Sequence, residues 1–409
     1  MEEQAKGTFE MSSREVNIVT TQTSQDAHDM ARLGKKQELK RNFRDLSILG
    51  LTSFASGGII QGVVFLNYPD YVAQQWHGTL MTIAIALIAF FVNTVGAKHL
   101  PMLEAIILFL HIFGFFVILI PLWVLSPRTT AAKVFGEFSN FGGWSSVGGA
   151  TIVGMITPTG SLAGFDAAAH MAEEVRDASK VVPRAMITTI ILNGLMGLIM
   201  IITFCFCITD LETLLSLPLG FPFVEVFRTA TGSTTGASLM SIVVIVLTIC
   251  TCTSGLAAAS RQIHTIGTEI PLNSVLFSLS IAVLISLVNL GSTTAFNSIV
   301  GLLNGSAGTA YALSLACLLW RRTRSGEALP PARFSLGRWG TPLNVFSLLY
   351  VVFSTAIGFF PIMRHVTVAT MNWSSVVYAG VLAIALVAYW AGGRKRYKGP
   401  VVFVQKEGY

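Results

Sequence analysis

The residues best suited to chemistry lie in one apolar stretch, residues 148–169, which holds helix-breaking residues and a carboxylate. Pro158 lacks a backbone N–H, and Gly160 and Gly164 weaken helices, so the sequence predicts a break in this segment. A helix broken inside a membrane frees backbone N–H and C=O groups, which are tolerated only beside protein or a water-filled cavity. Transporters use such breaks to bind substrates and cations. The alternative is a kinked helix whose small residues serve packing alone.

Six residues of this stretch form the expected substrate site, with the aromatic ring as a gate: Gly160, Ser161, Ala163, Gly164, Phe165 and Asp166. Asp166 is a carboxylate inside an apolar segment, which is a functional hypothesis by default. It would face the amine of a substrate or carry a coupling proton. Because it lies near one end of the segment, an acid that pairs with another helix or reaches the interface is an equally good interpretation.

A charged loop follows directly, and its Glu173 and Glu174 are further candidates for coupling or gating. Ion pairing between helix ends is the alternative role for these two acids. The spacing of His170 and Glu174 has a faint similarity to a metalloprotease helix, but no second histidine stands at metal-binding spacing, so no metal is expected. The sequence also has no phosphate-binding glycine loop and no Ser-His-Asp pattern. We therefore expect neither catalysis nor a cofactor, and nothing in the sequence indicates ATP-driven transport.

Composition places these residues in a polytopic membrane protein. Of the 409 residues, 53% are hydrophobic and 12% are charged, and the mean hydropathy is +0.66. A soluble enzyme, a disordered chain and a small disulfide scaffold are excluded, because such apolar runs need lipid as solvent. The five cysteines lie within apolar runs, which favours a packing role over disulfides.

Ten apolar segments are long enough to be transmembrane helices, and their continuous rather than alternating pattern excludes a β-barrel. The expected spans are 46–67, 78–96, 101–125, 148–169, 184–208, 236–259, 272–290, 295–320, 342–361 and 372–391. With the amino terminus in the cytosol, 23 of the 27 Lys and Arg residues fall on the cytosolic side. This asymmetry is typical of a ten-span topology with both termini inside.

Three regions follow from this topology: a cytosolic tail (1–45), a transmembrane domain (46–391) and a second cytosolic tail (392–409). The first tail is polar and carries no signal-peptide core. Its composition favours a disordered leader that sets orientation, and a regulatory tail is the alternative.

Several motifs together resemble the fungal branch of the amino acid–polyamine–organocation permeases, near the GABA and choline permeases. The resemblance covers residues 46–409, and it rests on 60–62, 66–71, 76–79, 164–167, 170–176, 182–185, 259–261, 289–293, 295–297 and 399–401. It implies an all-helical, LeuT-like transporter with twelve helices and two inverted five-helix repeats. In each repeat the first helix is broken, and substrate lies between the two breaks. The stretch 148–169 looks like family helix six, so residues 161–166 inherit the role of lining the substrate site.

One departure from the resemblance concerns the first repeat. Residues 43–52 look like the start of family helix one, and from about Thr52 the chain looks like the second half of helix three. The rest of helix one, all of helix two and the start of helix three are then missing, although the fusion preserves topology. A shorter loss follows Gln262. A shortened gene model or splice form would explain both losses.

The resemblance implies proton-driven uptake of an amino acid, GABA or a related amine such as choline across the plasma membrane. The expected partners are a small amine-bearing solute and the lipid bilayer, without nucleic acid. The alternative is a truncated, non-transporting isoform or a regulatory membrane protein of the same family. An intramembrane enzyme is disfavoured, because catalysis would need paired groups at membrane depth.

Overall fold

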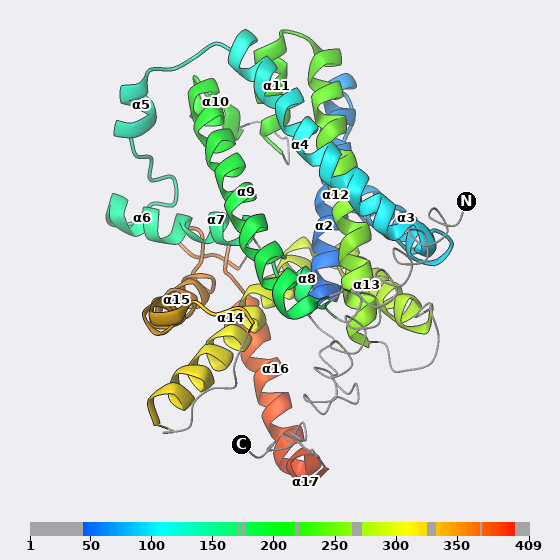
Figure 1. The fold of residues 1–409 in the computed structure, drawn as a ribbon. Coiled ribbons are helices and arrows are strands. Elements are labelled where there is room, and N and C mark those ends of the chain that lie inside the picture. Colours follow the sequence, from blue (N-terminus) through cyan, green and yellow to red (C-terminus); the bar gives the residue numbers. More distant parts are fainter. Residues whose placement is uncertain are drawn as a thin grey trace, which may run out of the picture.

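The computed structural model describes residues 44–162, 164–170, 172, 175, 177–216, 221–263, 272–324, 333–368 and 370–396. Within these ranges the chain is helical and contains no strand (Figure 1). The expected tail 1–45 lies almost wholly outside the described residues, and so does most of the tail 392–409.

Eight helices of the described residues are long and apolar enough to cross a membrane. Their bounds follow the expected segments closely: α3 (Gln75–Thr94), α4 (Leu100–Leu125, after η1, Ala97–His99), α9 (Ala178–Cys207), α12 (Thr234–Ile263), α13 (Leu272–Gly291), α14 (Thr293–Arg324), α15 (Gly340–Ile357, after η3, Gly337–Trp339) and α16 (Ser374–Ala388, continued by η4, Tyr389–Gly393, and α17, Arg394–Arg396). The other two expected segments are α2 (Arg44–Asn67), which is one continuous helix, and 148–169, which is broken into pieces.

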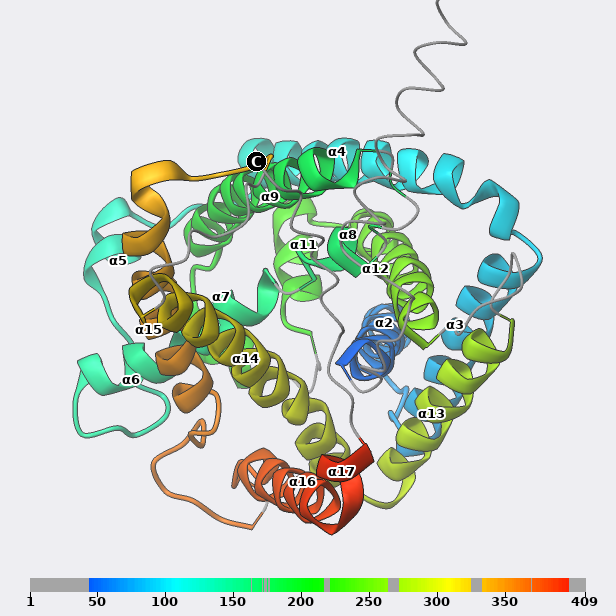
Figure 2. The ribbon, with the colours of Figure 1, turned by 60° about the horizontal axis from the view of Figure 1, so that its bottom comes forward.

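The helix α2 lies beside α3, α12 and α13, and these four helices form one side of the molecule (Figure 2). Small residues bring the helices together, because apolar surface gives no net attraction between helices in lipid. The hydroxyl of Ser53, which is fully buried in α2, donates to the sulfur of Cys252 in α12 at 3.4 Å. Apolar side chains of α3, α12 and α13, among them Ile85, Leu256 and Val275, complete this core.

Short helices lie near one end of α9. They are α5 (Ala131–Gly136), α10 (Leu211–Ser216) and α11 (Phe223–Thr231). One of them, α11, also packs against α4 and α12. The helix α11 is amphipathic: Phe227 is buried in a core with Leu122 and Leu214, whereas Arg228 pairs with Glu225 at the surface. It folds here because one face is apolar at helical spacing.

The helix α14 packs closely against α15 and α16, because its small residues lie at the contacts. A Cβ on Gly305 would lie 2.6 Å from Phe359 Cζ, and one on Gly308 would overlap the side chain of Thr355. The Thr309 hydroxyl also forms a hydrogen bond of 2.6 Å with the Tyr378 hydroxyl of α16. These contacts hold α14 in place beside the broken segment.

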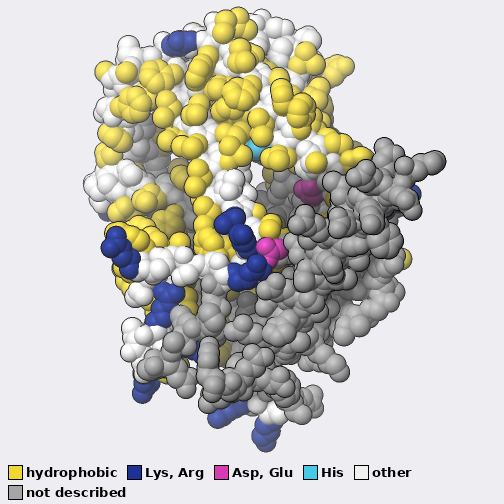
Figure 3. Space-filling model, in the orientation of Figure 1, with side chains coloured by type: hydrophobic (Ala, Val, Ile, Leu, Met, Phe, Trp, Pro, Cys, Tyr) yellow, Lys and Arg dark blue, Asp and Glu magenta, His cyan; other side chains and the backbone are white. Residues whose placement is uncertain are grey.

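Large apolar side chains cover the outside of the molecule, as Figure 3 shows for one face. In the same view, Lys and Arg gather on the lower half, where α14 and α16 end (Figures 1 and 3). An apolar exterior with charge gathered toward one end is the pattern of a protein that spans a bilayer. The chain is therefore a multi-pass membrane protein.

Candidate functional site

The break expected in residues 148–169 is present. The segment consists of α6 (Val147–Gly154), α7 (Ile156–Ser161) and α8 (Ala167–His170). Between α7 and α8, Gly164 has a φ of +93°, a conformation that residues with a side chain rarely adopt. A Cβ added here would contact nothing within 4 Å, so lack of space does not explain the glycine. Glycine is therefore required here by the backbone conformation. At the break, turn hydrogen bonds replace helical ones: the carbonyls of Gly164 and Asp166 accept from the backbone N–H groups of Ala167 and Ala169 at 3.0 and 2.9 Å.

The carboxylate of Asp166 lies at this break and is buried, with 6% of the residue exposed. Its Oδ2 accepts a hydrogen bond from the hydroxyl of Tyr311, which comes from α14. The ring of Phe165 stacks on that of Tyr311, with centroids 5.9 Å apart and planes 21° apart. A buried carboxylate beside an aromatic pair can bind an ammonium group or hold a proton.

Phe165 and Asp166 both contact Tyr311, whereas Gly160 and Ser161 are exposed and do not join this cluster. Ser161 is exposed, and its hydroxyl donates to the carbonyl of Thr157 in its own helix at 3.0 Å. Gly160 is exposed too, and a Cβ added there would meet nothing within 4 Å. The remaining expected residues, Ala163, Glu173 and Glu174, lie outside the described residues.

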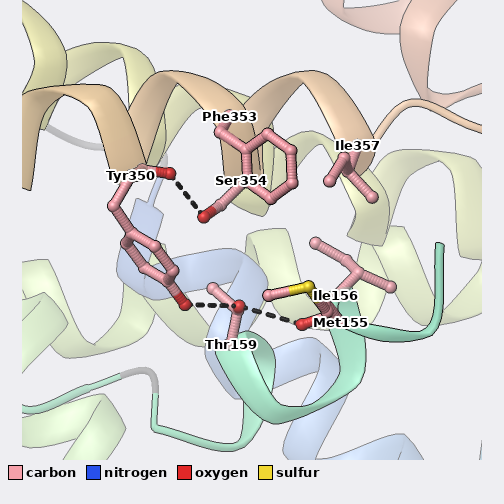
Figure 4. A pocket seen from close by; sticks show the side chains of 7 residues that line it. All are labelled: Met155, Ile156, Thr159, Tyr350, Phe353, Ser354 and Ile357. Carbon is pink, nitrogen blue, oxygen red and sulfur yellow. Dashed lines mark hydrogen bonds between the residues drawn. The ribbon is translucent and has the colours of Figure 1, made fainter. Parts of the chain in front are cut away.

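The helix α7 is attached to α15 through a polar contact inside an apolar patch (Figure 4). The Thr159 hydroxyl forms a hydrogen bond of 3.0 Å with the Tyr350 hydroxyl, and it also donates to the Met155 carbonyl at 3.1 Å. A cavity of about 10 Å³ lies between the two helices, lined by Ile156, Phe353 and their neighbours. This volume suits one water molecule rather than a substrate, so the contact serves to position α7.

A second carboxylate inside a span was missed by the sequence analysis, which concentrated on Asp166. Glu104 lies in α4, within the expected segment 101–125, and its Oε1 accepts from the Ser254 hydroxyl of α12 at 2.6 Å. The signal in the sequence that could have identified Glu104 was the presence of an acidic residue within an apolar segment. This bond joins α4 to α12, so Glu104 has a partner that suits a structural role.

Tyr311 was also missed, because its role depends on a contact across 145 residues of sequence. The only signal was a tyrosine directly after the small residues Gly308, Thr309 and Ala310. Close packing at these residues brings α14 near its neighbours, and the phenol lies within reach of the break. Within the described part of the chain, no group of His, Cys, Asp and Glu residues is arranged to hold a metal ion.

Comparison with known proteins adds a family match over most of the chain. The family described as "Amino acid permease" matches residues 46–382, which include α2 to α15, the break and Asp166. The match therefore covers each helix that forms the candidate site.

Three similar proteins illustrate the range of relatives. A protein of Macrophomina phaseolina named "Putative amino acid/polyamine transporter" is 28% identical, over 81% of this chain and 77% of that protein. The choline transporter of Saccharomyces cerevisiae is 29% identical, over 84% of this chain and 62% of that protein. The amino-acid permease BAT1 of Arabidopsis thaliana is 29% identical, over 87% of this chain and 74% of that protein.

Proposed function

The chain belongs to the amino acid permease family, which has the LeuT-like fold, and from this premise we propose that it is a secondary active transporter. It carries an amino acid, GABA or a related amine such as choline across the plasma membrane together with a proton. Both termini face the cytosol. The substrate binds at the break between α7 and α8, beside the pair of Asp166 and Tyr311.

The observation that carries this proposal is a buried carboxylate at the point where a helix is broken. A charge within an apolar segment is costly, and residues of this kind usually serve a substrate or ion pathway. In transporters, the ends of broken helices carry partial charges that complement a zwitterion: N–H groups for its carboxylate and C=O groups for its ammonium.

The proposed substrate class rests on charge. Substrates from amino acids to choline share a cationic nitrogen, which a carboxylate and the face of an aromatic ring both attract. Asp166 supplies the carboxylate, and Phe165 and Tyr311 supply rings that lie next to it. The names of the relatives, an amino acid/polyamine transporter and a choline transporter, agree with this class.

Uptake into liposomes tests the proposal. The purified chain would be reconstituted, and entry of radiolabelled GABA, choline and a panel of amino acids measured with an inward proton gradient. The expected result is uptake of at least one amine that falls when the gradient is collapsed. Absence of flux for every amine tested, from protein that is inserted and folded, would refute the proposal for this chain.

A specific observation favours the alternative of a non-transporting protein. The helix α2 is continuous from Arg44 to Asn67, whereas the first helix of each repeat is expected to be broken. The matched region also spans 62% of the yeast choline transporter. If the chain binds an amine at the Asp166 break without moving it, binding would be measurable by calorimetry while liposome uptake stays at the level of empty liposomes.

A further inference from the structure

We propose that the ends of α14 and α15 form a binding site for the headgroup of an anionic phospholipid. The site consists of Arg322, Arg324 and Arg338 with Trp320 and Trp339. It goes beyond the proposed transport function, although its place in the inner leaflet rests on the proposed orientation. The ligand is a membrane lipid that carries net negative charge, such as phosphatidylserine.

The first step of the argument is the pairing of arginine with exposed tryptophan on both helices. The Arg324 guanidinium lies 5.5 Å from the Trp320 ring, and that of Arg338 lies 5.8 Å from the Trp339 ring. The two tryptophans are 61% and 60% exposed. Tryptophan favours the level of the lipid headgroups, so the arginines beside it lie where phosphates lie.

The second step is that the arginines belong to one surface. The helices α14 and α15 pack against each other, and η3 precedes α15 directly. Arg322 Nη1 donates to the Thr341 hydroxyl at 3.3 Å, across the two helix ends. A Cβ on Gly340 would lie 3.0 Å from the same Nη1, so glycine leaves room for the guanidinium. One arginine is thus held between the ends of the two helices.

The third step is that no described acidic residue neutralises this charge. Arg322, Arg324 and Arg338 are exposed and form no ion pair with any described residue. Two other arginines are neutralised locally: Arg333 by Asp177 and Arg228 by Glu225. Guanidinium groups form bidentate hydrogen bonds with phosphate, so an anionic headgroup supplies the missing negative charge.

The chain offers a matched control at another helix end. The Arg394 guanidinium lies 5.4 Å from the Trp390 ring, with the same type of pairing, but it belongs to the end of α16 and not to this site. Arg394→Gln removes an equal charge beside a similarly exposed tryptophan. If binding were only a general attraction between positive charge and an anionic lipid, Arg394→Gln would weaken it as much as the loss of any one arginine of the site.

Native mass spectrometry of the full chain in neutral detergent tests the proposal. The probes are dioleoyl phosphatidylserine and dioleoyl phosphatidylcholine, with inorganic phosphate as competitor. We expect preferential phosphatidylserine binding, weakened about a hundredfold in the variant with Arg322→Gln, Arg324→Gln and Arg338→Gln, because each basic residue near an anionic surface contributes about fivefold. Arg394→Gln should retain the binding of the original chain.

Three results of the lipid comparison and the variants would overturn the proposal. They are equal binding of both lipids, unchanged phosphatidylserine binding in the triple variant, and an equal loss per arginine in Arg394→Gln. Displacement of the lipid by millimolar inorganic phosphate would also contradict it, since the acyl chains against α14 and α15 should hold the lipid. Gel filtration and unchanged phosphatidylcholine binding would establish that the triple variant is folded.

Discussion

The hydrogen bond between Tyr311 and Asp166 joins the broken segment to α14. Because the two residues are 145 positions apart in the sequence, this contact could not be predicted from the sequence. A hydrogen bond to a charged group contributes about 1.5–3 kcal/mol. If the carboxylate takes the amine or the proton, then the loss of its partner should affect transport as well as the attachment of the broken segment to α14.

We therefore predict that Tyr311→Phe lowers the maximal uptake rate about tenfold or more, in line with the loss of one such bond. The ring and its stacking on Phe165 remain, so the protein should fold and purify normally. Liposome uptake over a range of substrate concentrations would separate the rate from the apparent affinity. The matched control is Tyr350→Phe, which removes the hydroxyl that Thr159 contacts at the small cavity. An equal loss of rate in both variants would show that the effect is not particular to Asp166.

Asp210 gives a residue-scale prediction outside the membrane. A hydrogen bond from the Thr213 hydroxyl lowers the pKa of its carboxyl, and a bond from the Thr213 backbone N–H adds to this. A lowered pKa means that the charged form stabilises α10 at pH values above the ordinary pKa, and that this support is lost as the pH falls through the lowered pKa.

Asp210→Ala should therefore raise hydrogen exchange in residues 211–216 at neutral pH, since the start of α10 loses its cap. In the original chain the same amides, corrected for intrinsic exchange, should lose protection only below about pH 4. The helix α5 is the internal control, because its cap is the hydroxyl of Thr130, which accepts from the Lys133 backbone N–H at 3.3 Å and does not titrate. Protection of α10 that is unchanged in the variant would contradict the assignment.

At the scale of elements, the break between α7 and α8 depends on backbone conformation. A residue with a Cβ at the φ of Gly164 costs about 1–2 kcal/mol. Gly160 offers a matched position in the same segment, because it is exposed, lies within α7 and has open space around it.

Gly164→Ala should lower uptake at least fivefold, because the strain shifts the position of Asp166, whereas Gly160→Ala should leave uptake within twofold. Alanine favours helix at position 160 by about 1 kcal/mol, so this control is expected to be stable. Both variants would be compared for uptake per inserted protein. Equal activity in the two variants would show that the left-handed backbone at Gly164 is not needed for function.

The packing of α14 on α15 gives a second prediction at this scale. An added Cβ at Gly308 would overlap Thr355, and overpacking typically costs about 1–3 kcal/mol. Gly308→Ala should lower the midpoint of thermal unfolding in detergent by several degrees. Thr355→Ala should restore most of the loss, because it removes the atoms that clash. Gly380→Ala in α16, where nothing lies within 4 Å, is the control. Failure of the rescue would contradict the packing described here.

These elements also show what could be predicted from sequence. Hydropathy located the helices well, because each span must contain enough apolar residues to cross the lipid. The break was predicted from Pro158, Gly160 and Gly164, since the effect of proline and glycine on a helix is local. Only Gly164 lies at the break between α7 and α8, whereas Pro158 and Gly160 lie within α7. The partner of Asp166 could not be predicted, because it depends on how closely α14 approaches, which is decided by packing between distant segments. Ser161 shows the same limit: its hydroxyl bonds to its own helix instead of entering a site.

At the scale of the whole molecule, the distribution of charge implies an orientation. The strong excess of Lys and Arg on one side predicts that both termini face the cytosol. An epitope tag at either terminus should be detected in intact cells only after the membrane is permeabilised. Detection of one tag, but not the other, without permeabilisation would indicate an odd number of spans and would contradict the topology.

The central claim is that the chain couples an amine to a proton at Asp166. The most direct test is to trap a pH-sensitive dye inside liposomes that contain the chain, impose an inward gradient of amine without a pH gradient, and record the internal pH. The account predicts that the internal pH falls when the transported amine is added, and that Asp166→Asn abolishes this acidification while the protein remains inserted. Amine entry without a change in internal pH, or acidification that persists in Asp166→Asn, would contradict the account.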